Sequence, residues 1–192
     1  MKNVRVLDCT LRDGGRIIDC AFEDQEIKEI AQRLEEANID IIEVGFIRDG
    51  RKVHYEGNST FFTDVNQIKP FIKRDNPNAI YTAFIDYGMC DIDNLGEYDG
   101  SSIDAIRFRF TKKNYDEEKE EVLRWIRIIK EKGYKLFIQG VNSLNYSDRE
   151  LLEIVDMVNE VHPYSFGIVD TYGAMYMDDV DRLYGLIDHN ML

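Results

Sequence analysis

The chain has 192 residues, of which 44% are hydrophobic and 32% are charged, a composition typical of a globular protein with one sizeable core. Its formal net charge of −13 argues against a protein that binds nucleic acid through the phosphates, although arginines inside a pocket could still bind a small anion. No apolar run approaches the roughly 20 residues of a membrane span, and the N-terminus enters a strand pattern at once. We therefore expect no membrane segment and no signal peptide. The odd number of cysteines, without metal-ligand spacing, favours a reduced, cytoplasmic protein.

Strand and helix patterns alternate along the first half of the chain. An apolar strand at residues 4–9 runs into the segment Thr10-Leu11-Arg12-Asp13-Gly14-Gly15, and a helix follows over residues 24–37, where apolar residues recur at helical spacing. A nearly continuous apolar strand at 40–46 is typical of a buried parallel strand, and it precedes a polar loop at 48–59 and a helix near 60–74. A third strand at 79–85 precedes a short helical piece near 92–95.

The second half continues the same alternation. A strand at 103–110 leads to a long helix at 114–132 that Gly133 ends, and a strand at 135–140 leads to a helix that Ser147 caps, with Glu150 at the capping-box position. A sixth strand at 164–169 precedes a final helix from about 177 to near 189. Such alternation predicts parallel βαβ units, and the absence of Gly-x-Gly-x-x-Gly argues against a dinucleotide-binding Rossmann domain. We predict an α/β fold of the TIM-barrel type, with about six of the eight βα units, in a single domain over residues 1–192.

Polar residues within the strands mark the face that lines the barrel. Alternate residues of a strand face opposite ways, and the outward face must be apolar because it packs on helices. The alternation predicts inward-pointing side chains for Glu43, Arg107, Arg109 and Gln139, and it places Phe46 on the outward, helix-facing side. The strand ends deliver Arg12, Asp13, Asp170 and Thr171 to the same rim, where α/β barrels keep their chemistry. Burying so many ionisable groups is costly unless they are paired or bind a ligand or metal.

Three motifs resemble one known group of enzymes. The segments Thr10-Leu11-Arg12-Asp13-Gly14, Ile42-Glu43-Val44-Gly45-Phe46 and Asp170-Thr171-Tyr172-Gly173 resemble the DRE-TIM metallolyases, the carbon–carbon lyases and Claisen-condensing enzymes that include 3-hydroxy-3-methylglutaryl-CoA lyase, isopropylmalate synthase and 4-hydroxy-2-oxovalerate aldolase. The likeness covers nearly the whole chain in order, and the 2-oxo-acid aldolase branch is the most similar. The resemblance implies an eight-stranded α/β barrel with a divalent metal at its mouth.

The resemblance also implies roles for single residues. Asp13 matches the family's metal ligand, Arg12 matches the arginine that stabilises an enolate, and Glu43 matches an acidic residue near the metal and its water. Asp170 lies at the family's strand-six position. Retro-aldol cleavage leaves an enolate, which a Lewis-acidic metal and a guanidinium can stabilise together. The sequence does not choose between Mg²⁺, Mn²⁺ and Zn²⁺, and Arg107 or Arg109 could hold a substrate carboxylate through bidentate hydrogen bonds.

Two departures from the family pattern limit this reading. Arg16 stands three residues after the motif's aspartate, where the family has histidine or glutamine, so a different proton acceptor is required. No His-x-His occurs in the sequence, although the family has two histidine metal ligands on strand seven, so we expect those two ligands beyond Leu192. A complete barrel needs about 250 residues. We therefore expect an N-terminal piece of a longer protein, in which the metal could be absent and whose open barrel edge self-associates.

The predicted function is a divalent-metal-dependent, aldolase-like carbon–carbon lyase acting on a small 2-oxo or 4-hydroxy-2-oxo acid, impaired or inactive as this piece. One alternative is an acyl-CoA-dependent condensing enzyme, and another is a barrel fragment without catalysis that binds a small anion or a partner chain. Plainer roles remain open for single residues. Arg12 could form an ion pair with Asp13 or Glu43, and Asp170 could anchor the loop after the sixth strand.

Overall fold

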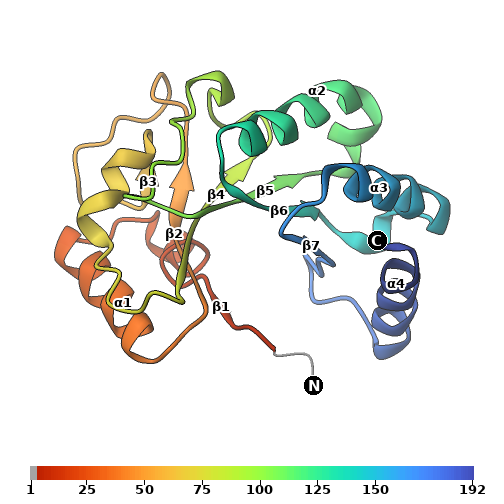
Figure 1. Ribbon diagram of the computed structural model, residues 1–192, viewed down its shortest axis with the longest axis horizontal. Helices are drawn as coiled ribbons and strands as arrows, with labels where there is room; N and C mark the ends of the chain where they lie inside the picture. The colour runs from red at the N-terminus through yellow and green to blue at the C-terminus, as the bar shows by residue number, and fades with distance from the viewer. Residues whose placement is uncertain (1–3) are drawn as a thin grey trace.

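The computed structural model describes residues 4–192 and has a curved parallel sheet at its centre, with helices around the outer side (Figure 1). The strand order along the sheet is β1 (Leu7–Asp8), β2 (Ile41–Ile47), β4 (Ile80–Asp86), β5 (Ala105–Phe110), β6 (Lys135–Gly140) and β7 (Ser165–Gly167). A short strand, β3 (Phe61–Phe62), pairs in parallel with the end of β2. Among the described residues no ladder joins β7 to β1, so the barrel is incomplete. The predicted fold class, six strands in barrel order, is confirmed.

Four α-helices lie where the sequence predicted helices. They are α1 (Asp24–Glu36), α2 (Lys112–Glu131), α3 (Asp148–Val161) and α4 (Met177–Asn190). The predicted capping box of α3 is confirmed, because the Ser147 hydroxyl accepts from the Glu150 backbone N–H while the Glu150 side chain accepts from Ser147. Helix α2 begins two residues earlier than predicted, since Thr111 and Asn114 form a capping box of their own. Short 3₁₀ turns η1 (Gly14–Ile18), η3 (Ile92–Asn94) and η4 (Ser143–Asn145) fill loops at the strand ends.

The helix predicted near residues 60–74 is wrong. Phe61 and Phe62 form β3, and only a 3₁₀ turn, η2 (Val65–Phe71), follows. Asp64 starts this turn by accepting from the backbone N–H of Asn66, and Pro70 lies inside it. Proline supplies no N–H for a regular helical ladder, and aromatic residues favour a strand, so both residue types work against a long α-helix here.

Three strands are shorter than predicted. Strand β1 covers only Leu7–Asp8, whereas the predicted strand covered residues 4–9. Val4, the first residue of the predicted strand, is 88% exposed. The chain turns after it because the Cys9 carbonyl accepts from the backbone N–H groups of Arg12, Asp13 and Gly14. Strand β5 begins at Ala105 instead of residue 103, and β7 spans Ser165–Gly167 instead of 164–169. Strands at the two open ends of a sheet have a partner on one side only, which favours short strands there.

Apolar side chains on the outer face of the sheet and on the helices form one large core. Residues such as Ile42, Ala83, Ile106 and Ile138 are fully buried there, facing Ile27, Ile126 and Val155 of the helices. A smaller cluster closes the inner face at the amino ends of the strands, built from Ile41, Ile80, Ala105 and Phe137 with Leu7. The inner face is therefore apolar at its base, and its polar residues lie toward the carboxyl ends of the strands. Within residues 4–192, no helix is both long and apolar enough to span a membrane.

A bulge in β2 reverses one predicted side-chain direction. Glu43 pairs with Thr82 of β4, whereas Phe46 pairs with Phe84, so β2 has one extra residue between these two pairs. Phe46 consequently packs against Phe84 on the inner side, with ring centroids 5.8 Å apart, and not on the outer face as predicted. Gly45 in the bulge has a φ of +153°, and a Cβ there would lie 2.9 Å from both the Phe62 ring and Thr60 Cβ.

We expect Gly45→Ala to lower the free energy of unfolding by about 3 kcal/mol, because the added methyl group must displace β3 or distort the bulge. Urea unfolding followed by circular dichroism measures the effect. Gly185→Ala is the matched control, since an added Cβ in α4 meets no atom within 4 Å. That control should leave stability unchanged or raise it by up to about 1 kcal/mol through helix propensity. Equal stability of Gly45→Ala and the unaltered protein would show that the bulge does not need glycine.

Candidate functional site

A cavity of about 400 Å³ opens at the carboxyl ends of the strands. It contains seven of the eight site residues predicted from the sequence: Arg12, Asp13, Arg107, Arg109, Gln139, Asp170 and Thr171. The eighth, Glu43, is fully buried and lies beneath the cavity wall, in contact with two of the arginines. The structure thus brings together at one mouth side chains that are up to 159 residues apart in the chain.

The inner arginine pair, Arg12 and Arg107, shares one carboxylate. Arg12 Nε donates to Glu43 Oε1 and Arg107 Nη1 donates to Glu43 Oε2. All three side chains are buried, with Arg12 and Arg107 each 8% exposed. Burial raises the pKa of Glu43, and the two guanidiniums oppose that rise. Burial by itself would lower the pKa of Arg12, but Glu43 and Asp13 outweigh it and the pKa is raised. The plainer role foreseen for Arg12, an ion pair with Asp13 or Glu43, is realised with both partners.

The outer arginine pair, Arg48 and Arg109, shares a second carboxylate in the same way. Asp86 Oδ1 accepts from Arg109 Nη1 at 2.5 Å, and Asp86 Oδ2 accepts from Arg48 Nη2 at 3.2 Å. The sequence did not predict Arg48 and Asp86 as site residues. The predicted strands ended at residues 46 and 85, one residue before β2 ends at Ile47 and β4 ends at Asp86. The signal was available for Asp86, which continues the inward alternation of Thr82 and Phe84 along β4. Burial lowers the pKa of Arg48, with Asp86 acting in the opposite direction.

Two aromatic rings stack against the guanidinium groups of three of these arginines. Arg12 Cζ lies 4.4 Å and Arg107 Cζ 5.4 Å from the centroid of the Phe84 ring. Arg48 Cζ lies 4.2 Å from the centroid of the Phe46 ring. Such stacking is favourable for a desolvated guanidinium and fixes the plane in which its N–H groups point. The bulge at Gly45 is what delivers Phe46 to this position, so the backbone of β2 shapes the site directly.

Asp13 faces two cations at the rim. Its Oδ1 accepts from Arg12 Nη1 at 2.5 Å and from Arg16 Nε at 3.1 Å. Arg16, the residue that departs from the family pattern, therefore forms an ion pair with the predicted metal ligand. Throughout residues 4–192 no group of three or more His, Cys, Asp or Glu side chains is placed to hold a metal ion. The described residues do not make a complete metal centre, and metal ligation by Asp13 stays a prediction.

Residues after β6 and β7 close the other side of the cavity. Asp170 accepts from the backbone N–H groups of Ala174 at 2.9 Å and Met175 at 3.0 Å, and these hydrogen bonds lower its pKa. Thr171 Oγ1 accepts from the backbone N–H of Asn142 at 2.9 Å. Both side chains thus fix the loop after β7, which is the plainer role foreseen for Asp170, and both still line the cavity. Gln139 lines it from β6, beside Gly167.

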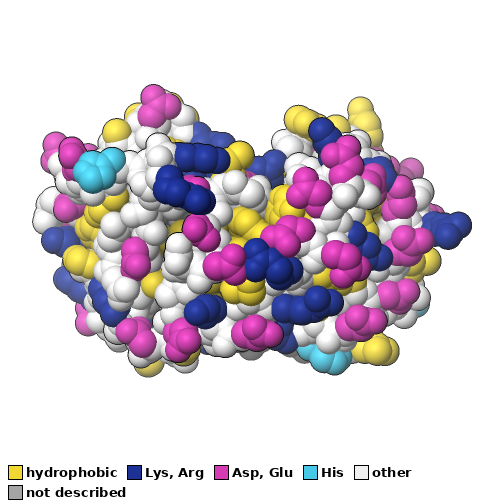
Figure 2. All heavy atoms as spheres, turned by 90° about the horizontal axis from the view of Figure 1, so that it is seen from above, with side chains coloured by type: hydrophobic (Ala, Val, Ile, Leu, Met, Phe, Trp, Pro, Cys, Tyr) yellow, Lys and Arg dark blue, Asp and Glu magenta, His cyan; other side chains and the backbone are white. Residues whose placement is uncertain are grey.

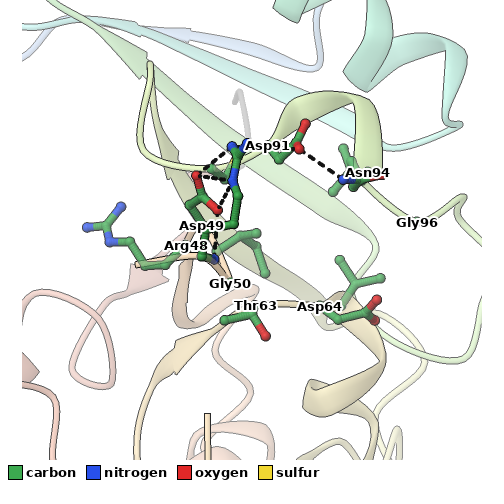
Figure 3. Close-up of a pocket in the computed structure, with 13 residues that line it drawn as sticks. Arg48, Asp49, Gly50, Thr63, Asp64, Asp91, Asn94 and Gly96 are labelled. Carbon is green, nitrogen blue, oxygen red and sulfur yellow. Dashed lines mark hydrogen bonds and ion pairs between the residues drawn. The ribbon is translucent and has the colours of Figure 1, made fainter. Parts of the chain in front are cut away.

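A second cavity of about 350 Å³ lies between the loops that follow β2, β3 and β4 (Figure 3). Asp49 binds Arg51 through a 2.7 Å contact, and Asp91 lies 3.7 Å from the same guanidinium. Figure 3 shows the side chain of Arg48 turned away from this group. The residues around Asp49 are therefore satisfied locally, whereas Arg48, which also lines this second cavity, pairs its guanidinium with Asp86.

An incomplete parallel barrel with an arginine-lined cavity at the carboxyl ends of its strands defines a chain of the α/β-barrel fold class. Residues 3–191 match the HMGL-like family, so the chain belongs to the HMGL-like family. This match confirms the resemblance to the DRE-TIM metallolyases that the motifs indicated.

Individual relatives agree with this family. The chain is 23% identical over 195 residues to homocitrate synthase of Methanocaldococcus jannaschii, covering 100% of this chain and 46% of the relative. It is 25% identical over 195 residues to (R)-citramalate synthase of the same organism, covering 98% of this chain and 37% of the relative. The chain therefore spans less than half the length of each of these curated relatives. Its fold is similar to the crystal structure of the N-terminal domain of a candidate aldolase from Bacteroides vulgatus, with a TM-score of 0.75 and 19% identity, covering 98% of this chain and 62% of that one.

Proposed function

We propose that the protein makes or breaks a carbon–carbon bond next to the carbonyl group of a small 2-oxo acid, in an aldolase-like lyase reaction. The observation that supports this most is the inner arginine pair. Arg12 and Arg107 both line the cavity, and Glu43 holds them in place from below. Two fixed guanidiniums at one wall suit a substrate with a carboxylate next to an oxygen that becomes negative during the reaction.

Arg12 and Arg107 would bind different groups of the substrate. Cleavage next to a carbonyl leaves an enolate, so the protein must place positive charge where that oxygen develops. Arg12 is oriented by Glu43 and Asp13, and it would hold the enolate oxygen without reorganising during the reaction. Arg107 has N–H groups beyond the one given to Glu43 and would bind the carboxylate through two of them. Glu43 would position both arginines, since it lies beneath the cavity and does not line it.

A divalent metal would supply a Lewis acid at the same oxygen. Asp13 is the residue that we propose as its ligand in this chain, and the remaining ligands are not provided by the described residues. We therefore assign no step to the metal and derive the roles of the chain's own side chains alone.

The proposed partners follow from the same features. The substrate is a small carboxylate, and self-association would use the open strands β1 and β7, each of which pairs on one side only in the described structure. A cytoplasmic location is part of the proposal, because Cys9, Cys20 and Cys90 form no disulfide.

A second candidate is the condensing direction, in which an acyl-CoA supplies the carbanion. The names of the relatives favour it, since homocitrate synthase and citramalate synthase are both synthases. Both directions pass through an enolate, so the role of Arg12 is the same in each. The two differ in the second substrate, and addition of acetyl-CoA to a 2-oxo acid tests the alternative directly.

Hydrogen–deuterium exchange tests the proposal. The protein is incubated with pyruvate in D₂O, with and without added Mn²⁺ or Mg²⁺, and the methyl proton signal is followed by NMR. We expect exchange above the rate of the protein-free control, because enolisation precedes any bond formation at that carbon. Binding of pyruvate without any exchange would overturn the lyase proposal, and addition of acetyl-CoA would then distinguish a condensing enzyme from a non-catalytic anion-binding protein.

A further inference from the structure

Two separate cationic centres lie at the cavity, although a substrate with a single carboxylate would need only one such centre. Around the inner arginine pair, the three guanidiniums of Arg12, Arg16 and Arg107 face the two carboxylates of Asp13 and Glu43, which leaves one uncompensated positive charge. In the outer arginine pair, Arg48 and Arg109 face the single carboxylate of Asp86, which leaves a second one. Without Arg48, Asp86 would neutralise Arg109, so Arg48 is the residue that keeps the outer centre positive.

From this arrangement we propose that the substrate is a 2-oxo acid with a second anionic group, a carboxylate or a phosphate, which binds at the outer arginine pair. This inference rests on the proposed function, in which the inner pair takes the 2-oxo acid end. Arg109 would contact the second anion, because it lines the cavity and its side chain is 32% exposed. Arg48 would act through Asp86, as a positioning residue that determines specificity.

The spacing of the two centres sets the length of the substrate. Arg107 and Arg109 are two residues apart on β5 and face the same side, which separates their backbone positions by about 6 to 7 Å. Arg12 stacks on the Phe84 ring and Arg48 stacks on the Phe46 ring, and the centroids of these two rings are 5.8 Å apart. An extended five-carbon acid with a carboxylate at each end spans such a gap. The cavity of about 400 Å³ is also larger than a three-carbon acid requires.

Other charges near the cavity do not remove the need for a second anion. Asp13 is already shared between Arg12 and Arg16. Asp170 adds a negative charge at the cavity wall, but its carboxylate is bound by backbone N–H groups of its own loop, and within residues 4–192 it forms no ion pair with either arginine pair. Arg48 Nη1 is buried and has no hydrogen-bond partner among residues 4–192, and leaving a charged donor unsatisfied is costly. The face seen in Figure 2 carries acidic side chains scattered among lysines and arginines, and the chain as a whole has a net charge of −13.

Matched ligands test the proposal by isothermal titration calorimetry. The probes are 2-oxoglutarate and 2-oxopentanoate, which have the same carbon chain and differ in the second carboxylate, together with 3-phosphohydroxypyruvate, a 2-oxo acid with a terminal phosphate. We expect 2-oxoglutarate or 3-phosphohydroxypyruvate to bind at least about tenfold more tightly than 2-oxopentanoate, because an additional charge-assisted pair forms. The stronger of the two identifies the second group as a carboxylate or a phosphate.

The variant Arg48→Met retains an apolar stem over Phe46 and removes the charge. We expect the ratio of the two affinities, 2-oxoglutarate to 2-oxopentanoate, to fall from about tenfold to near one, whereas a purely structural role would weaken both acids equally. Arg109→Met removes the contacting group itself and should have the same effect if the buried Arg48 variant does not fold. Arg51→Met is the control, since Arg51 is paired with Asp49 outside the mouth and should leave the ratio unchanged.

The outcomes separate this inference from the proposed function. Equal affinities for 2-oxoglutarate, 3-phosphohydroxypyruvate and 2-oxopentanoate in the unaltered protein would overturn the second anion site and leave the lyase proposal standing. A tenfold ratio that persists in both Arg48→Met and Arg109→Met would overturn the assignment to the outer pair. Failure of every 2-oxo acid to bind would overturn both proposals.

Discussion

Replacing Arg12 with methionine should slow enolisation of pyruvate by about 100- to 1,000-fold, the loss that follows when one donor to a developing oxyanion is removed. The fold should survive, because Glu43 keeps Arg107 as its partner and no buried carboxylate is left alone. The measurement is the rate of methyl deuteration in D₂O, with the unfolding midpoint in urea as a check on the fold. Pyruvate binding should weaken far less than the exchange rate falls, since Arg107 still holds the carboxylate.

A conservative variant sharpens this test. Arg12→Lys keeps the charge, but a single ammonium cannot reproduce the fork that reaches both Glu43 and Asp13. We expect its exchange rate to lie between those of the unaltered protein and Arg12→Met. Arg51→Met, at an exposed ion pair outside the cavity, should exchange at the unaltered rate. If Arg12→Met deuterates pyruvate as fast as the unaltered protein, Arg12 takes no part in stabilising the enolate.

The polar residues of the site could be located from the sequence wherever a strand is regular. Strand β5 alternates without interruption, so Arg107 and Arg109 were correctly placed on the inner face, and their register with Phe84 and Asp86 of β4 follows from parallel pairing. Glu43 was placed correctly for the same reason, because it precedes the bulge in β2. The period of two is a property of the local backbone, and it needs no knowledge of the tertiary structure.

The alternation failed where the backbone departs from it. The bulge at Gly45 shifted Phe46 to the inner face, and the glycine was its only local sign in the sequence. Arg48 lies in the loop after β2, as predicted, but the hydrogen bond from its backbone N–H to the Phe62 carbonyl beside β3 could not be predicted. Which carboxylate each arginine would share also could not be predicted, because the partners lie on different strands and the choice depends on side-chain geometry. The mouth could be predicted as a set of residues, and its division into two arginine pairs required coordinates.

The conversion of Glu43 to glutamine is expected to have the largest effect on stability, lowering the free energy of unfolding by about 3 to 5 kcal/mol. Glu43 is fully buried and is the carboxylate that both Arg12 and Arg107 contact, so its neutralisation leaves Arg107 without an ion-pair partner and Arg12 with only Asp13 at the rim. Glutamine retains the shape of the glutamate side chain and one acceptor oxygen, so the loss of stability would result from the missing charge and not from a cavity. Urea unfolding at neutral pH measures the difference, and Glu56→Gln at an exposed glutamate is the control, expected to change stability by less than about 0.5 kcal/mol.

A triple variant distinguishes stability from function at the same place. In Arg12→Met, Glu43→Leu and Arg107→Met combined, no charge of the inner pair remains, and replacement of a buried ionic group by apolar residues of similar size is often neutral or stabilising. We expect the triple variant to recover most of the stability that Glu43→Gln loses, yet to bind pyruvate at least about 100-fold more weakly, because both guanidiniums of the inner pair are gone from the cavity. A stable triple variant with unaltered pyruvate affinity would mean that the inner arginine pair is structural. A triple variant as unstable as Glu43→Gln would mean that the ionic contacts themselves hold β1, β2 and β5 together. The buried charges would then be required for the stability of the fold, whether or not a ligand is bound.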